Sequence, residues 1–315
     1  MSAAASVSAA PSAESTVVWY SALDRQTLNT VVQKFNAIHP GLTLEALQSG
    51  SALIPPRVMT EQTAGKYNVD VVSCDQFGLS QLADAGLFQR YKPRDADKFI
   101  KGAIDSKGYW VSLLNSTTVI AWNPQRLKLD RLSPPKSLDD LAKPEWKGKL
   151  GIDGVAYNWY QGLLATRKDA PALLKRLADN KPLITSAHNI TIAQLINGEF
   201  DATPTAYGYL AERARRAGKP IDFLTPSPVI VGLEPVAIAK NAPHPIAARI
   251  LVDWLLSKEM QQFFADDERT SARSDVTNDA RIFNLKMPFY ILPAPDRTEY
   301  NAWVSAYKAL LGIAG

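Results

Sequence analysis

Two tyrosines separated by one glycine, Tyr207 and Tyr209, are the side chains whose type and spacing point most directly to ligand chemistry. Residues 200–205, just before them, are predicted to be a short strand, and Pro204 marks its end or an edge position. A helix is predicted to follow the tyrosines and to run to Gly218. A turn from strand to helix lies at the rim of an α/β sheet, where such folds bind ligands. The alternative is that both rings are half-buried and pack against the next helix.

Small polar turns also follow the strands predicted at residues 17–21, 42–47 and 70–73. Each of these strands precedes a helix with an apolar face, which is the pattern of a parallel sheet covered by helices. Because the carboxyl ends of parallel strands share one edge of a sheet, these turns are expected to lie together. The residues that we expect to contact a ligand, here and in the second half of the chain, are Ser21, Asp24, Ser49, Gly50, Ser51, Asp75, Gln76, Asn115, Tyr157, Asn158, Trp159, His188, Tyr207, Tyr209 and Glu234.

The second half of the chain has a similar alternation of strands and helices. Residues 109–114 and 119–122 are predicted to be two strands joined by a polar turn. Asn189 is the expected N-cap of a helix that Gly198 ends. Residues 236–239 are predicted to be a strand that returns the chain to the first unit.

With 315 residues the chain is too long for one ordinary core, and two α/β lobes are expected. The chain is predicted to leave the first lobe near Leu114 and to return near Glu234, so that two crossing segments form a hinge. The last helix is expected to pack across or on the second lobe. The predicted lobes are residues 16–114 plus 234–280 and residues 115–233 plus 281–315.

Composition argues against several classes of function. A net charge of +4, with no basic stripe interleaved with aromatic residues, gives no reason to expect nucleic-acid binding. One cysteine, Cys74, and three histidines allow no disulfide within the chain and no Cys-based or His-rich metal site. The densest basic run, Arg213, Arg215 and Arg216 beside Glu212, is interpreted as a solvated helix face.

The beginning of the sequence and its hydropathy bear on localisation. Residues 1–15 are rich in Ala and Ser and lack the apolar stretch of a signal peptide, so we interpret them as a flexible leader. No run of 18 apolar residues occurs, so we do not expect the protein to span a membrane. We also expect a monomer.

Several short motifs occur in an order and spacing that are specific when taken together. They are the strand and turn at 17–22, Pro40-Gly41 before residues 42–47, Asp70-Val71-Val72 before Asp75-Gln76, and the segments 144–151, 197–202, 242–245 and 254–261. Over residues 16–312 this arrangement resembles the extracellular solute-binding proteins of ABC importers, and most closely their ferric-ion-binding subfamily. The resemblance implies an α/β fold with two lobes joined by two crossing hinge strands, the type II periplasmic-binding-protein-like fold.

The resemblance also implies a set of metal ligands. In the ferric-ion-binding subfamily, two adjacent tyrosines hold Fe³⁺ together with a carboxylate and sometimes a histidine of the first lobe. Here Tyr209 matches the second tyrosine, Gly208 stands at the first, and Tyr207 precedes it by one residue. Asp75 matches the carboxylate and Asp24 the histidine position. The implied metal ligands are therefore Asp24, Asp75, Tyr207 and Tyr209, oxygen donors that suit a hard cation.

The resemblance implies that the protein binds a solute for transport. The protein is expected to be periplasmic and to capture a small solute between its lobes, then deliver it to a membrane permease of an ABC import system. Ferric iron or an iron complex, with a synergistic anion, is the first hypothesis for the solute, and no resident cofactor is expected. An enzyme is not expected.

A small anionic or phosphorylated solute is an alternative. Ser49, Gly50, Ser51 and the turn at residues 154–158 offer hydroxyl and backbone N–H groups at helix starts. Such groups bind anions. Turns of this composition are also common without any ligand.

An amine-containing solute and an enzymatic function are two further alternatives. An amine would lie among Asp24, Asp75 and Glu234, with Trp159 or a tyrosine as a cation–π partner. Asp24 also suits a plain helix cap, and Trp159 also suits the core. An active site between the lobes would use His188 or a carboxylate as its base, but no nucleophile-elbow, dinucleotide, P-loop or zincin motif occurs.

Overall fold

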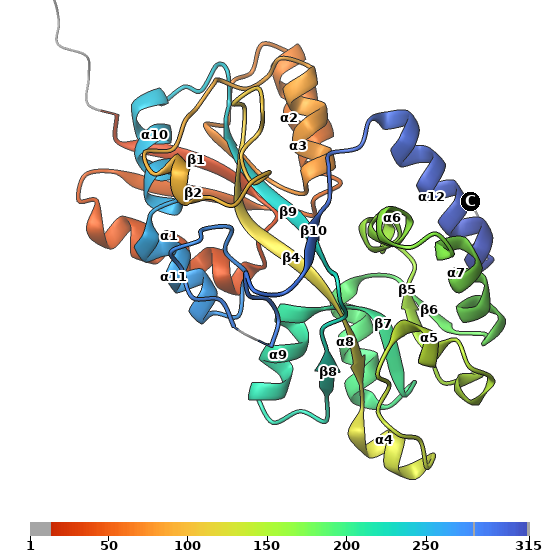
Figure 1. Ribbon diagram of the computed structural model, residues 1–315. Helices are drawn as coiled ribbons and strands as arrows, with labels where there is room; N and C mark the ends of the chain where they lie inside the picture. Colours follow the sequence, from red (N-terminus) through yellow and green to blue (C-terminus); the bar gives the residue numbers. More distant parts are fainter. Residues whose placement is uncertain (1–13, 280, 314–315) are drawn as a thin grey trace, which may run out of the picture.

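The first lobe is built from strand–helix units and two later helices. The computed structural model describes residues 14–279 and 281–313, and the first units lie at the upper left of Figure 1. The elements of this lobe are β1 (Thr16–Ser21), α1 (Arg25–Ile38), β2 (Thr43–Gln48), α2 (Ile54–Thr63), β3 (Val71–Ser73), α3 (Gln76–Asp84), a 3₁₀ turn (Ala96–Lys98), α10 (Pro245–Leu255) and α11 (Lys258–Asp266).

The second lobe follows the same plan, with shorter strands. Its elements are α4 (Pro124–Leu129), α5 (Leu138–Leu141), a 3₁₀ turn (Pro144–Trp146), β5 (Gly151–Asp153), α6 (Tyr157–Thr166), α7 (Ala170–Asp179), β6 (Leu183–Thr185), α8 (His188–Asn197), β7 (Ala202–Tyr207), α9 (Gly208–Arg216), β8 (Asp222–Leu224), β10 (Phe289–Ile291) and α12 (Arg297–Leu311).

Two long strands connect the lobes. In Figure 1, β4 (Val111–Trp122) and β9 (Val229–Ile238) run antiparallel through the middle of the molecule. In the described chain the main sheet has the order β2-β1-β3-β9-β4-β7, with β10 beside β9 and β8 beside β4, and β5 and β6 form a second sheet. These pairings confirm the α/β class. We propose the lobe bounds predicted from the sequence, because β4 and β9 lie where the crossings are expected.

The directions of the strands bring two sets of turns to face one another. β1 is parallel to β2 and β3, and β3 is antiparallel to β9. In the second lobe β5 is parallel to β6 and bridges in parallel to the start of β7, and β7 is antiparallel to β4. The carboxyl ends of β1 to β3 and of β5 to β7 therefore open onto one cleft beside β4 and β9, as ligand-binding α/β sheets require.

The structure corrects the prediction of two strands at residues 109–114 and 119–122. They form one strand, β4, and all of its twelve residues are buried. Residues 111–117 pair with β9, and residues 118–122 pair with β7. Because both partners satisfy the backbone, the polar segment at the centre stays extended instead of turning.

Three smaller predictions also change. The helix expected to be capped by Asn189 begins at His188, and no side chain caps it. Glu14 and Ser15 are not part of a free leader: Glu14 accepts a hydrogen bond from the backbone N–H of Ala247 in α10, and the carbonyl of Ser15 accepts one from Thr43. The rest of the predicted leader, residues 1–13, lies outside the described residues.

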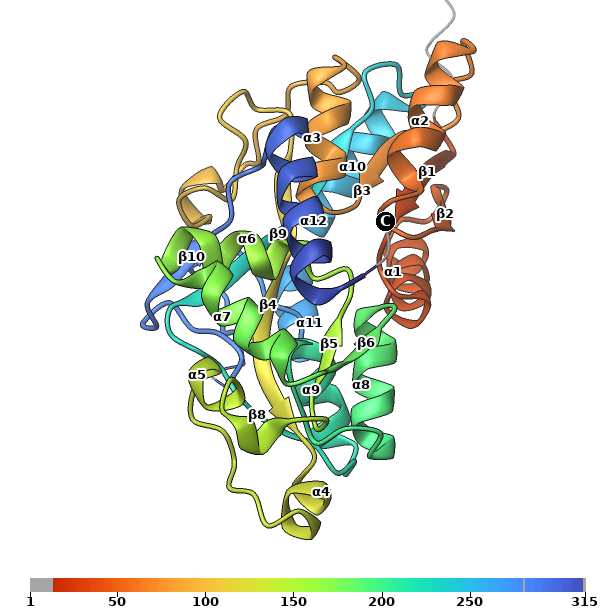
Figure 2. The ribbon, with the colours of Figure 1, turned by 90° about the vertical axis from the view of Figure 1, so that its right-hand side faces the viewer.

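A further connection between the lobes accompanies the two long strands. The backbone N–H of Thr277 donates to Gln262 in α11 of the first lobe, whereas the guanidinium of Arg281 donates to Asp222 in β8 of the second. The chain therefore passes between the lobes a third time, in addition to the two predicted crossings. α12 then packs on α6 and α7, and its first turn reaches α3 (Figure 2).

Candidate functional site

The two tyrosines form the centre of a continuous stack in the cleft. Tyr207 is the last residue of β7 and the N-cap of α9, and Tyr209 lies in the first turn of that helix. Their ring centroids are 6.0 Å apart with an interplanar angle of 29°. The ring of His188 lies 3.7 Å from that of Tyr207, and the guanidinium carbon of Arg269 lies 3.7 Å from the centre of the Tyr209 ring. The stack therefore runs from an imidazole to a guanidinium.

Arg269 is the buried cation of the site. Its side chain is only 4% exposed, and Nη2 donates to Oδ2 of Asp24 over 2.5 Å. Burial opposes its charge, but Tyr209 and the carboxylates of Glu234 and Asp24 outweigh that effect and raise its pKa. Its Nε has no hydrogen-bond partner among the described residues. A buried N–H without a partner is costly, so this group can accept a ligand oxygen.

Asp24 and Asp75, two of the metal ligands implied by resemblance, both cap helices. Asp24 accepts from the backbone N–H of Thr27 at the start of α1, and Asp75 accepts from that of Gly78 at the start of α3. Burial opposes the charge of Asp24, but the bonds from Thr27 and the charge of Arg269 outweigh it and lower the pKa. Burial raises the pKa of Asp75.

Glu234 lies at the middle of β9, opposite Leu114 of β4. Burial raises its pKa, and the charge of Arg269 opposes that change. No hydrogen bond to its carboxylate occurs among the described residues, although the charges of His188, Asp75 and Asp24 all act on it. Glu234 is therefore an acidic side chain in the cleft without a fixed partner.

His188 forms a close pair with Asp153 at the other end of the stack. Its Nδ1 lies 2.5 Å from Oδ2 of Asp153, whose side chain is fully buried. The angles are not those of a regular hydrogen bond, and neither atom has another partner within the described chain. The other oxygen of Asp153 accepts from the backbone N–H of Val155. This pair holds His188 where it can face a ligand.

Among the described residues, three helix starts beside the cleft in the second lobe have no side-chain cap, whereas α1 and α3 of the first lobe are capped and α2 is not. No side chain caps α6, α8 or α9, which begin at the carboxyl ends of β5, β6 and β7. Their first N–H groups face the cleft and carry the positive end of the helix dipole. In the first lobe the caps Asp24 and Asp75 already neutralise the starts of α1 and α3.

The remaining residues that the sequence analysis expected at the ligand have varied roles. Ser21 is fully buried and its Oγ accepts from Leu23 and Ser73. The hydroxyl of Ser51 accepts from the backbone of Asp75, and the amide of Gln76 lies against the backbone at residues 292 and 294. The amide nitrogen of Asn115 is buried in β4, where no described residue accepts a hydrogen bond from it. Ser49 and Gly50 lie in the turn between β2 and α2.

The three ligand candidates at the start of α6 have different surroundings. Asn158 lines a cavity of about 20 Å³ together with His188 and Tyr207. Trp159 is 3% exposed and packs in the hydrophobic core of the second lobe, and it also lines this cavity, so its expected contact with a ligand stays a prediction. Tyr157 instead makes an edge contact with Tyr300 of α12, at a centroid distance of 6.1 Å.

The basic run of α9 is partly exposed, as a solvated face would be, and its arginines also form a network of ion pairs. Glu212 is buried and pairs with Arg215 and Arg216. Arg213 pairs with Asp267 at 3.0 Å, and Arg216 pairs with Glu268 at 3.2 Å. Because residues 267 and 268 precede Arg269 in the first lobe, this network fixes Arg269 beside the tyrosine turn.

Sequence reasoning missed three residues of the site: Arg269, Tyr300 and Phe77. Arg269 lies in a turn after α11 with no motif around it, and Tyr300 belongs to a helix near the end of the chain. The rings of Phe77 and Tyr300 stack face to face across the cleft, with centroids 3.7 Å apart. Phe77 follows the cap Asp75 by two residues, and this was the only local signal available.

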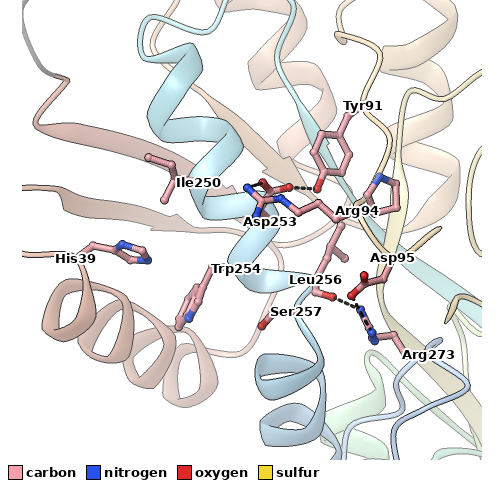
Figure 3. Close-up of a pocket in the computed structure, with 11 residues that line it drawn as sticks. His39, Tyr91, Arg94, Asp95, Ile250, Asp253, Trp254, Leu256, Ser257 and Arg273 are labelled. Atoms are coloured by element: carbon pink, nitrogen blue, oxygen red, sulfur yellow. Dashed lines mark hydrogen bonds and ion pairs between the residues drawn. The ribbon is translucent and has the colours of Figure 1, made fainter. Parts of the chain in front are cut away.

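A larger cavity of the described chain lies away from this cleft. It has a volume of about 360 Å³ and is lined by the end of α1, the last turns of α10 and Arg273 (Figure 3). Figure 3 places Trp254 and Ile250 along one wall and Tyr91, bonded to Asp253, on another. Inside the cleft, the spaces beside Glu234 and His188 measure only about 10 and 20 Å³. We assign the site to the cleft, because the charged and uncapped groups converge there.

Two further observations concern the class of protein. Among the described residues, no three His, Cys, Asp or Glu side chains form a cluster that could hold a metal ion. Within the same part of the chain, no helix has the length and hydrophobicity needed to cross a membrane. The fold, with two groups of strands and helices connected by β4 and β9, is the arrangement of proteins that bind a ligand between two lobes.

The comparison with known families identifies the chain further. Residues 21–262 match the model of the bacterial extracellular solute-binding protein family, and the chain belongs to this family. The resemblance stated from the sequence is therefore confirmed, and so is the transport class of the protein.

Individual relatives differ in what they bind. The chain is 24% identical to the Fe(3+)-binding periplasmic protein of Serratia marcescens, over 80% of this chain and 77% of that one. Iron-bound HitA from Pseudomonas aeruginosa has a TM-score of 0.78 at 21% identity, covering 94% of this chain and 99% of HitA. AfuA from Actinobacillus pleuropneumoniae, with fructose-6-phosphate bound, has a TM-score of 0.75 at 19% identity, covering 94% and 96%. At such identities these structures confirm the predicted fold and leave the solute open.

Proposed function

We propose that this protein is the periplasmic solute-binding component of an ABC import system and that its solute is a small organic molecule with a negatively charged group. The solute binds between the lobes, and the closed protein delivers it to a membrane permease. Arg269 is the observation that carries the choice of solute. Its guanidinium lies on Tyr209 and bonds to Asp24, which are two of the four ligands that a ferric site would use.

A metal ion at these residues would be repelled by the positive charge of Arg269. Two unit charges roughly 4 Å apart interact by about 4 kcal/mol at an effective dielectric constant of about 20, and a trivalent ion would be repelled in proportion to its charge. An oxyanion instead gains from the same guanidinium, because hydrogen bonds between charged groups are about twice as strong as neutral ones. The free Nε of Arg269, the ring of His188 and the uncapped starts of α6, α8 and α9 are the donors that support this proposal.

Ferric iron is the second candidate, and the relatives favour it. The Serratia marcescens protein is named for Fe(3+) binding, and HitA was solved with iron bound. Tyr207 and Tyr209 supply two phenol oxygens from one turn, which suit Fe³⁺. Burial raises the pKa of both phenols, and the surrounding carboxylates raise that of Tyr207 further, so forming the phenolates requires the metal itself.

Two measurements on purified protein distinguish these candidates. Calorimetric titration with fructose 6-phosphate and with ethyl phosphate should give saturable binding, and Arg269→Gln should weaken that binding at least about tenfold. A visible spectrum with ferric citrate should show no phenolate-to-iron charge-transfer band. A band that is lost in Tyr209→Phe, with no binding of either phosphate ester, would replace the anionic solute by iron. His188→Gln provides a second test of the anion site if Arg269→Gln fails to fold.

A further inference from the structure

Two carboxylates from different strands meet on the floor of the cleft. β3 and β9 are antiparallel, and Ser73 lies opposite Val236. Continuing that register by two residues places Asp75 opposite Glu234. Burial raises the pKa of Glu234, the charge of Arg269 lowers it, and the charge of Asp75 raises it further. Neither carboxylate accepts a hydrogen bond from a Lys or Arg side chain in the described residues.

The nearby basic groups are already committed elsewhere. Arg269 donates Nη2 to Asp24, and Arg213 pairs with Asp267. His188 lies against the buried carboxylate of Asp153. No Lys or Arg side chain forms an ion pair with Asp75 or Glu234 in the described chain, although the charge of Arg269 acts on Glu234 and lowers its pKa. Both carboxylates are half-buried, and a carboxylate away from water is stabilised by pairing or hydrogen bonds: Asp75 has the bonds of its helix cap, whereas Glu234 has none within the described residues.

Aromatic rings stand beside this pair of carboxylates. Tyr300 stacks on Phe77, two residues after Asp75, and Tyr157 meets the edge of Tyr300. Burial, with the charge of Asp75 as a further cause, raises the pKa of Tyr300 to about 12. Rings of this kind attract a desolvated ammonium group through their faces. The wall is therefore suited to a cation held by the two acids.

Other groups of the same cleft favour a negatively charged ligand group. Arg269, nine-tenths or more buried, has a free Nε, and the uncapped starts of α8 and α9 lie in the second lobe. These groups take an oxyanion, whereas Asp75 and Glu234 take a cation. The Nε of Arg269, a donor without a partner among the described residues, thus gives independent support for a ligand in the cleft that holds the acidic pair.

From this arrangement we infer that the solute is a zwitterion, a small molecule with a protonated amine and an oxyanion. Glu234 and Asp75 hold the amine beside the ring of Tyr300. Arg269 and His188 hold the oxyanion. This inference rests on the proposed function, which supplies the anionic group, and adds the amine. It names Glu234 as the residue that distinguishes solutes with an amine from those without one.

Three related probes, which share a two-carbon unit, test the inference by calorimetric titration of the full chain. Phosphoethanolamine carries both charges, ethyl phosphate carries only the oxyanion, and ethanolamine carries only the amine. Phosphoethanolamine should bind at least about tenfold more tightly than ethyl phosphate, and ethanolamine should bind most weakly. In Glu234→Gln the preference for phosphoethanolamine over ethyl phosphate should disappear, while the affinity for ethyl phosphate should stay the same or rise.

Control variants and outcomes separate this inference from the proposed function. Glu199→Gln, an exposed glutamate at the end of α8, should keep the preference. Equal binding of phosphoethanolamine and ethyl phosphate to the wild type overturns the zwitterion and leaves the anionic solute in place. Binding of neither phosphate ester overturns the proposed function itself. If Glu234→Gln does not fold, Tyr300→Leu gives a second test, because loss of the ring should reduce the same preference.

Discussion

At the scale of single residues, Glu234 is an acidic group of the cleft to which no hydrogen bond is donated within the described residues. Its folded pKa lies above the ordinary value of 4.5 because of burial, and Asp75 and Asp24 act in the same direction while Arg269 and His188 oppose them. For a carboxyl group with a raised pKa, the folded state carries no penalty below the unfolded pKa. The penalty grows as the pH rises through the folded pKa.

Glu234→Gln should therefore stabilise the ligand-free protein in a pH-dependent way. The melting temperatures of variant and wild type should be similar near pH 4, and the variant should become the more stable as the pH approaches 7. Thermal unfolding measured over this range checks the prediction, with Glu199→Gln as the control. A constant difference at all pH values would mean that the amide acts through packing and not through charge.

At the scale of elements, the turn from β7 to α9 depends on Gly208. A Cβ at this position would lie 2.7 Å from Cγ2 of Ile282 and 2.9 Å from Oγ1 of Thr117. Both neighbours are buried, Thr117 in the central strand β4 and Ile282 in the core, so they have little room to move. The glycine is thus the reason that α9 starts close to β4 and presents both tyrosines to the cleft.

Gly208→Ala should destabilise the fold by about 1–3 kcal/mol, the usual cost of overpacking a tight site. It should also weaken solute binding, since the tyrosine turn would be displaced. Chemical denaturation and calorimetric titration measure the two effects. Gly50→Ala is the matched control for stability, because a Cβ there meets nothing within 4 Å. Unchanged stability in Gly208→Ala would contradict the close approach of α9 to β4.

At the scale of the whole molecule, contacts on two flanks hold the lobes together. On one flank Arg213 and Arg216 of α9 pair with Asp267 and Glu268. On the other flank Phe77 stacks on Tyr300, and Arg297 donates to Gln81 over 2.9 Å. An aromatic stack contributes about 0.5–1.5 kcal/mol beyond its buried area. The second flank therefore favours the closed arrangement by an amount that one substitution can remove.

Tyr300→Ala should shift the ligand-free protein towards an open form. Small-angle X-ray scattering should give a larger radius of gyration for the variant, and solute affinity should fall about 2- to 12-fold, the equivalent of the lost stacking energy. Asn301→Ala changes the next, exposed residue of α12 and should alter neither quantity. A variant with the wild-type radius but weaker binding would assign Tyr300 to ligand contact alone.

The sequence by itself determined the elements and their chemistry at short range. Asp24 and Asp75 follow buried strands and precede helices, and each caps its helix because a carboxylate at that position bonds the first free N–H groups. Gly198 ends α8 in the left-handed conformation that glycine adopts most readily. Such local rules, together with the order of the motifs, were sufficient for the α/β fold and for the cleft edge.

Only the tertiary structure decided which charges meet in the cleft. Arg269 is 245 residues from Asp24 in the chain, and Tyr300 is more than 200 residues from Phe77, yet each pair is in contact. No local pattern encodes such distances, because they depend on how the lobes close and on where the chain passes between them. The same reason explains why the polar centre of β4 stayed extended and why Trp159 entered the core. The preference for one solute over another thus depends on tertiary packing. The framework that binds a solute instead follows from the local sequence patterns of strands, turns and helices.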